Sequence, residues 1–528
     1  MVKNKIKTPK ALKTTFVKAV GVVATTPKGP DEKLDKLFRE VQKRQLFGDG
    51  KTFVDLVPRR SSPTILKAYD AERKSPDFDL KDFVGRNFYN LKKPSRERPT
   101  DETLSASEHI SELWKDLMVT NRLDRGSLLA LPYEYIVPGG RFQEQFYWDS
   151  YFIMLGLATE NKWRLIEGMM KNYTYMIRRF GLIPTANRSY FLTRSQPPFF
   201  SHMVELLSQQ YGNYTIVEYL PYLLKERRFW AQGSRKLNAD YRAERRVAML
   251  PDGSILNRYY DNASSPRPES YAQDITTVQD IATTAEDEHR DDIYLHLRAA
   301  AESGWDFSSR WFTNPNELNT IHTTDIIPID LNCLLYHLEL TIAKAYRLIK
   351  QRRLSKIYSN IAAKRAAAIQ KYCWDEQRQF FYDYDFVRRE NTSSETLAAV
   401  FPLYVGLANH KQAAAVAAKL ERDFLRDGGL VTTLVSNDQQ WDAPNGWAPL
   451  NYIAIKGLRR YGYIKLADTI KQRWLQTNQL VFERHHKFIE KYDVINPGEL
   501  GGGGEYDLQD GFGWTNGVFE SLFTLPVK

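Results

Sequence analysis

The sequence predicts a mainly α-helical protein whose body runs from about residue 60 to the end of the chain. Three observations predict this fold class: apolar residues recur at helical spacing in several segments, strand patterns are sparse, and the chain is long enough for one large core. Of the 528 residues, 42% are hydrophobic and 26% are charged, as in an ordinary globular protein. This composition excludes a mostly disordered chain, a collagen-like fibre and a polytopic membrane protein.

Individual helices follow from the spacing of apolar residues. Residues 110–118, 334–349 and 416–424 each form one apolar stripe, and the third stripe stops at two glycines. A further helix is expected to end at Gly181, because two arginines precede this glycine and favour the negative end of the helix dipole. The best strand signal is a hairpin around residues 251–254.

The chain is predicted to form a basic tail over residues 1–33 and a single domain over 34–528. No repeat of 20–50 residues and no long linker divides the body. The tail holds eight Lys and two acidic residues, so it carries +6 of the net charge of +10. We expect a disordered extension, because its apolar run over residues 19–24 is shorter than a signal peptide requires. A degenerate export signal is the alternative.

Several partners and cofactors are not expected. The body shows no basic and aromatic patch for nucleic acid, and no later stretch is long and apolar enough to cross a membrane. The nine His show no metal-ligand spacing, and no phosphate-binding glycine loop is present, so neither a metal nor a cofactor is expected. With only Cys333 and Cys373 and no clear signal peptide, a cytoplasmic location is favoured, with the periplasm as the alternative.

Tryptophan precedes aspartate more often than chance allows. Four of the 11 Trp do so, at 148–149, 305–306, 374–375 and 441–442, where roughly 0.7 would be expected from average composition. Such a ring can stack on a sugar, or it can desolvate the carboxyl and raise its pKa, as a general acid requires. A helix-terminal Asp beside a core Trp is the plainer explanation for any one pair, and we assign it to Trp374-Asp375.

Two dense segments carry a family resemblance. Residues 138–152 match P-G-G-R-F-x-E-x-Y-x-W-D-x-Y, with Phe146 replacing the usual Tyr, and residues 440–449 match Q-W-D-x-P-x-G-W-x-P. Over about residues 35–525 the chain resembles the trehalases, glycoside hydrolase family thirty-seven. The resemblance implies an (α/α)6 toroid with long loops and a few short strands. It also implies hydrolysis of α,α-trehalose to two glucoses by an inverting mechanism, and we expect a monomer.

The resemblance also implies roles for individual residues. It makes Asp306 the general acid and Glu490 the general base. It implies that trehalose is bound by Arg141, Trp148, Asp149, Asn187, Arg194, Ser195, Gln196, Arg267, Pro268, Glu269, Gly304 and Glu505. The glycine run at 501–504 would form a lid that brings Glu505 onto the sugar.

Local chemistry agrees with these two catalytic roles. Trp305 and Phe307 flank Asp306, so its carboxyl is expected to hold a proton near neutral pH. Lys491 follows Glu490 and would keep that carboxylate ionised. Two alternatives stay open: a related toroid hydrolase for another disaccharide, and a non-catalytic sugar sensor. The sensor is less favoured, because both proposed catalytic carboxylates are present.

Overall fold

The structure is a computed structural model that describes residues 26–91, 103–240, 242–281, 290–504, 508–509 and 511–526. Its helices carry the fold, as predicted. In the described part of the chain every strand is two or three residues long. The predicted tail at 1–33 lies mostly outside the described residues, and helix α1 already begins at Pro30.

An inner ring of helices forms the centre of the larger body. In the described residues these are α6 (Tyr147–Thr159), α8 (Phe200–Tyr211), α12 (Ile329–Leu348), α14 (Phe401–Tyr404), α16 (Ala448–Arg460) and α18 (Gly513–Phe523). Each helix packs on the next, and α18 packs back on α6, so the ring closes. Helix α6 is buried without a break from Tyr147 to Leu157. An inner helix covered on all sides must be apolar all round, which explains why α6 shows no clear stripe.

Outer helices cover this ring. They are α5 (Ala106–Asp116), α7 (Trp163–Phe180), α9 (Tyr214–Trp230), α13 (Arg352–Tyr372), α15 (His410–Lys419) and α17 (Ile464–His485). Helix α7 packs on α6 and α8, α9 packs on α8 and α12, and α17 packs on α16 and α18. The fold is therefore the helical toroid that the resemblance implied. Two further helices, α10 (Tyr271–Ile281) and α11 (Arg290–Ser303), lead into the loop that carries Asp306.

Local predictions of helix ends and turns are confirmed. Helix α7 ends at Phe180, and Gly181 takes the left-handed conformation with φ 81°. The third predicted stripe is α15 continued by a π-helical turn over Leu420–Phe424, after which the chain turns at the two glycines. The predicted hairpin is formed by two antiparallel strands that pair Met249 with Ile255.

The short strands are β1 (Val57–Pro58), β2 (Phe88–Tyr89), β3 (Met118–Val119), β4 (Tyr135–Ile136), β5 (Ala243–Glu244), β6 (Val247–Met249), β7 (Ile255–Asn257), β8 (Ile326–Ile327), β9 (Trp374–Asp375), β10 (Phe380–Phe381), β11 (Tyr384–Asp385), β12 (Glu390–Asn391), β13 (Leu425–Arg426), β14 (Gly429–Leu430), β15 (Asn445–Gly446) and β16 (Tyr492–Asp493). They form seven small antiparallel sheets among the described residues. The pairing of β15 with β16 matters for the site, because it joins the segment after Trp441 to the segment after Glu490.

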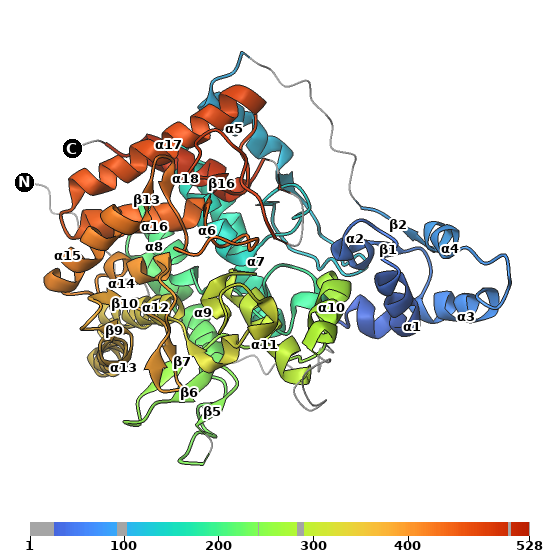
Figure 1. Cartoon of the computed structure of the whole chain (residues 1–528), viewed down its shortest axis with the longest axis horizontal. Coiled ribbons are helices and arrows are strands. Elements are labelled where there is room, and N and C mark those ends of the chain that lie inside the picture. Colours follow the sequence, from blue (N-terminus) through green and yellow to red (C-terminus); the bar gives the residue numbers. More distant parts are fainter. Residues whose placement is uncertain are drawn as a thin grey trace, which may run out of the picture.

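The N-terminal helices form a second, smaller core. They are α1 (Pro30–Lys43), α2 (Gly50–Asp55), α3 (Ser62–Glu72) and α4 (Leu80–Asn87), and Figure 1 shows α1, α3 and α4 projecting from one side of the main body. Their apolar residues pack together and onto Phe146, Tyr190 and Phe191 of the toroid. No helix that the structure describes is long and apolar enough to cross a membrane.

Candidate active site

A cavity opens at one end of the ring, where inner helices begin. Trp148 and Asp149 lie in the first turn of α6, Trp447 caps α16, and Phe512 caps α18, and all four line the cavity. The positive ends of these helix dipoles therefore face the cavity, where they favour negative charge and hydroxyl oxygens.

The predicted general acid reaches the cavity on a sharp turn after α11. Gly304 takes φ 76°, and a Cβ atom there would lie 2.9 Å from the Trp148 ring, so this position requires glycine. Two residues later, the Asp306 side chain is 33% exposed and points into the cavity. Its Oδ2 lies 3.9 Å from Nη1 of Arg267.

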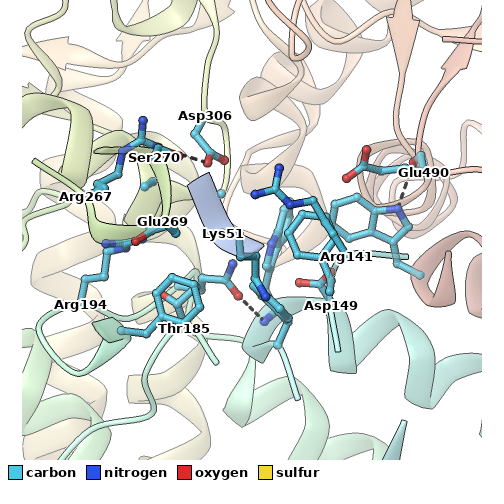
Figure 2. A pocket seen from close by; sticks show the side chains of 18 of the residues that line it. Lys51, Arg141, Asp149, Thr185, Arg194, Arg267, Glu269, Ser270, Asp306 and Glu490 are labelled. Carbon is cyan, nitrogen blue, oxygen red and sulfur yellow. Dashed lines mark hydrogen bonds and ion pairs between the residues drawn. The ribbon is translucent and has the colours of Figure 1, made fainter. Parts of the chain in front are cut away.

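The predicted general base lines the same cavity from another segment of the chain. Glu490 is only 2% exposed, and Nζ of Lys491 lies 3.7 Å from its Oε2. Its backbone is fixed: the amide donates to the Gln509 carbonyl at 3.1 Å, and the Trp514 indole N–H donates to the Glu490 carbonyl at 3.1 Å. Figure 2 shows Asp306 and Glu490 on opposite sides of the cavity.

Three predicted arginines line the cavity, and each is held by a carboxylate. Arg267 makes a two-pronged contact with Asp274, with Nη2 2.6 Å from Oδ1. Arg194 binds Glu269 and also contacts Asp261 at 3.4 Å. Such pairs fix the planar forks of the guanidinium groups, so their remaining donors are oriented before a ligand arrives. The third, Arg141, lies 3.7 Å from Asp49.

Two carboxyls on the cavity wall have opposite electrostatic settings. Burial raises the pKa of Asp149 to about 8, and the charges of Glu490 and Asp306 add to the effect against its own backbone hydrogen bond. Burial acts in the same direction on Glu269, but the charges of Arg194 and Arg267 outweigh it. The pKa of Glu269 therefore lies below its usual value. The wall thus presents one carboxyl that holds its proton near neutral pH and one carboxylate.

A stack of tryptophans forms an apolar wall. The rings of Trp441 and Trp447 lie 3.8 Å apart at an interplanar angle of 2°, and Trp305 continues the stack 5.4 Å from Trp441. Trp148 and Trp514 also contact this stack, with ring centroids 5.8 Å and 6.3 Å from that of Trp441. These rings are almost fully buried and cover one another's faces, so they give the cavity a rigid apolar wall.

The structure brings most of the predicted binding residues together. The cavity is lined by the predicted residues Arg141, Trp148, Asp149, Arg194, Gln196, Arg267, Glu269, Gly304, Asp306 and Glu490. Gln196 also accepts a hydrogen bond from the Trp148 amide at 3.2 Å.

Other predicted residues do not line this cavity. The Asn187 side chain is fully buried, accepting from the Gln145 amide at 2.9 Å and donating to the Leu129 carbonyl at 2.9 Å. The Ser195 hydroxyl donates to the Ile183 carbonyl at 2.6 Å. The Pro268 carbonyl accepts a hydrogen bond from the Gln42 side chain at 2.8 Å. These three support the walls rather than face the cavity. Glu505 lies outside the described residues.

The cavity also has lining residues that the sequence did not single out as binding residues. They are Lys51, Phe142, Phe146, Thr185, Phe191, Ser270, Ala301, Trp441, Trp447, Phe512 and Trp514. The two tryptophans of the second motif could have been proposed from the same resemblance. Lys51 could not, because it comes from α2 in the N-terminal core, where nothing in the sequence marks it. Its Nζ donates to Asp55 at 2.6 Å and to Glu144 at 3.1 Å.

The other Trp-Asp pairs have structural roles. Asp442 is fully buried and accepts from the Ser308 hydroxyl and the Ser309 amide, both at 2.7 Å, so it anchors the loop that follows Asp306. Asp375 pairs with Arg378 at 2.7 Å outside the cavity. Among the described residues, no group of three or more His, Cys, Asp or Glu is arranged to hold a metal ion.

Comparison with known proteins gives one consistent answer. A model of the trehalase family matches residues 45–525. The chain belongs to the trehalase family. It is 47% identical to a periplasmic trehalase of Salmonella dublin over 502 residues, covering 95% of this chain and 87% of that protein. It is 45% identical to a periplasmic trehalase of Escherichia coli O1:K1 over 504 residues, with coverage of 95% and 88%.

Solved structures agree with the trehalase fold. Neutral trehalase Nth1 from Saccharomyces cerevisiae superposes with a TM-score of 0.62 at 28% identity, over 79% of each chain. A GH63 mannosylglycerate hydrolase from Thermus thermophilus superposes with a TM-score of 0.52 at 18% identity, over 79% of this chain and 99% of that one, and this likeness concerns the fold alone.

The comparisons overturn one prediction. The cytoplasmic location is wrong, because these close trehalase relatives are named periplasmic. The prediction relied on the small number of cysteines and on the short apolar run of the tail. Neither is decisive, since a protein without disulfides can function in an oxidising compartment.

Proposed function

We propose that this chain hydrolyses α,α-trehalose to two glucose molecules, with inversion at the anomeric carbon that is attacked. The observation that carries the proposal is the pair Asp306 and Glu490, which face one cavity from distant segments of a chain in the trehalase family. Inverting glycosidases use two carboxyl groups separated widely enough for a water molecule beside the sugar.

Each carboxyl has one task. Asp306 donates its proton to the glycosidic oxygen as the bond from that oxygen to the anomeric carbon breaks. Glu490 takes a proton from water, whose oxygen bonds to the same carbon from the opposite face. One glucose leaves as the α-anomer and the other forms as the β-anomer. Protonated Glu490 and ionised Asp306 then exchange a proton with solvent to restore the starting state.

The environment of each group supports its task. Asp306 is partly exposed beside a cavity through which a proton can be resupplied. Glu490 lies near the Lys491 ammonium, which favours the carboxylate form that a base needs. The fixed forks of Arg194 and Arg267 suit the hydroxyl groups of the bound sugar, and the buried tryptophans give the cavity a rigid apolar wall.

The location and assembly of the enzyme belong to the same proposal. Since the relatives are named periplasmic trehalases, we infer that this chain also acts in the periplasm. We expect a monomer that takes trehalose as its substrate.

The test uses two variants that keep the shape of the side chains. Asp306→Asn and Glu490→Gln should each lower kcat on trehalose by about 10²–10⁴-fold, the usual contribution of a general acid or base. Circular dichroism spectra should match the wild type. Early proton NMR of the wild-type reaction should show equal amounts of α-glucose and β-glucose. Release of α-glucose alone would exclude inversion.

Two controls address the alternatives. Glucose release from a panel of disaccharides distinguishes trehalose from other substrates. Calorimetry that shows trehalose binding by the wild type without turnover would favour a sugar sensor.

A further inference from the structure

One buried side chain connects the segments that carry the two catalytic carboxyls. Nε2 of Gln440 donates to the backbone carbonyl of Asp306 at 2.5 Å. Its Oε1 accepts from Nζ of Lys491 at 2.8 Å. A single amide therefore joins the backbone of the proposed acid to Lys491, the neighbour of the proposed base, although the two segments lie far apart in the sequence.

Gln440 is itself held in place by its surroundings. It is 1% exposed, and its carbonyl accepts from the side chains of Asn445 at 3.0 Å and Trp447 at 3.1 Å. The next residue adds a second tie, because the Trp441 amide donates to the Phe307 carbonyl at 3.1 Å. The backbone of Gln440 is therefore held in place, so its side-chain amide can hold the Asp306 carbonyl and the Lys491 ammonium at fixed positions.

Gln440 acts on the surroundings of the two carboxyls, through the backbone of Asp306 and the ammonium of Lys491. The hydrogen bond from Gln440 is to the backbone carbonyl of Asp306 and not to its carboxyl. On the other side, Gln440 and the Gly503 carbonyl, which lies 3.2 Å from Nζ, take hydrogen bonds from the Lys491 ammonium. They orient this cation beside Glu490, 3.7 Å from its Oε2.

We propose that Gln440 is a positioning residue that sets the separation between the general acid and the general base. A side-chain amide suits this task because it donates at one end and accepts at the other without a charge. A carboxylate at this position could accept from Lys491 but would place an oxygen against the Asp306 carbonyl. The inference rests on the proposed function of Asp306 and Glu490.

The decisive variant is Gln440→Glu, compared on trehalose and on α-glucosyl fluoride. Fluoride leaves without protonation, so hydrolysis of the fluoride needs the base but not the acid. We expect kcat on trehalose to fall by about 100-fold with KM changed by less than about threefold. The fold-decrease in kcat on the fluoride should be at least about tenfold smaller than that on trehalose.

Gln439→Glu is the matched control, because it makes the same substitution at the neighbouring, partly exposed position. It should retain wild-type kcat on both substrates. If Gln440→Glu does not fold, Gln440→Met keeps the length of the side chain and removes both hydrogen bonds, and the same expectations apply.

Each outcome has one meaning. Equal losses on the two substrates, unchanged kcat, or an effect carried wholly by KM would overturn the role of Gln440. If the wild type does not hydrolyse the fluoride, the test is whether Gln440→Glu lowers kcat on trehalose while KM stays nearly unchanged. Failure of the proposed function would show separately, as a wild type without trehalose hydrolysis or as Asp306→Asn with unchanged kcat.

Discussion

At the scale of single residues, Asp149 shows how the environment sets the charge of a carboxyl. It is buried at the start of α6 and faces the same cavity as Asp306 and Glu490. Its pKa of about 8 in the folded chain contrasts with 3.8 for the free side chain. Between these values the folded chain retains a proton that the unfolded chain has lost.

This difference makes a prediction about stability. Because the folded state binds more protons, the wild type should lose free energy of unfolding as the pH rises from about 4 to about 8, by at most about 1.4 kcal/mol per pH unit. Asp149→Asn cannot titrate and should lack this loss. Urea unfolding of both proteins at pH 5, 6 and 7 would test this, and parallel curves would contradict it.

The side chains that the sequence did not reveal depend on packing. Arg194 and Arg267 could be assigned because the resemblance to trehalases extends over their positions. Lys51 could not, because it reaches the cavity only through the packing of α2 against residues 268–270. Asn187 shows the opposite case: its amide has the right chemistry for a sugar, yet the fold uses it to hold backbone groups. Residue type alone cannot distinguish these two uses.

At the scale of elements, the glycine run at 501–504 packs closely on the second motif. The Asn445 side chain donates to the Gly502 carbonyl at 2.8 Å, and the Gly504 amide donates to the Asp438 carbonyl at 3.1 Å. Added Cβ atoms at Gly501, Gly503 and Gly504 would lie 2.7–2.8 Å from neighbouring oxygens. Replacing all four glycines would therefore damage this contact as well as stiffen the loop.

Single substitutions separate these effects. Gly503 has φ 77° and meets the Asp438 carbonyl, whereas Gly502 has open space around its Cβ position. Gly503→Ala should lower kcat on trehalose by about tenfold or more, because it displaces the carbonyl that orients Lys491, and it should cost about 1–3 kcal/mol of strain. Gly502→Ala should behave like the wild type. Equal kinetics of the two variants would contradict this account of the loop.

Elements were predictable to the extent that their signals are local. Helix ends such as Gly181 and the hairpin at Gly253 follow from the residues at the turn itself. Helix α6 gave no stripe, because it is buried all round, and only the family resemblance indicated its place. The closed ring depends on contacts between helices that are distant in sequence, which periodicity does not encode.

At the scale of the whole molecule, the N-terminal core supports the wall of the site. Nε2 of Gln42 donates to the Pro268 carbonyl at 2.8 Å, and a Cβ at Gly50 would lie 2.6 Å from the Glu269 carbonyl. The two cores are therefore in close contact beside the predicted sugar-binding arginines. A substitution that destabilises the smaller core should therefore also disturb the positions of the residues that line the cavity.

Leu37→Ala tests this coupling, because Leu37 is fully buried in α1. The free energy of unfolding should fall by about 2–5 kcal/mol, as for other buried leucines, and KM for trehalose should rise. Leu123→Ala, at a side chain that is 66% exposed, is the control and should change stability by less than about 0.5 kcal/mol. An unchanged KM in a destabilised Leu37→Ala protein would show that the two cores act independently.

The contact between α18 and α6 has a consequence for biosynthesis. These helices meet at Gly156 and Gly517, so closely that a Cβ at Gly517 would overlap the Phe152 carbonyl. Helix α18 is synthesised about 360 residues after α6, and at typical elongation rates this interval is tens of seconds. Until then the face of α6 that α18 covers lacks its partner. The ring of inner helices can therefore close only after nearly the whole chain has been made.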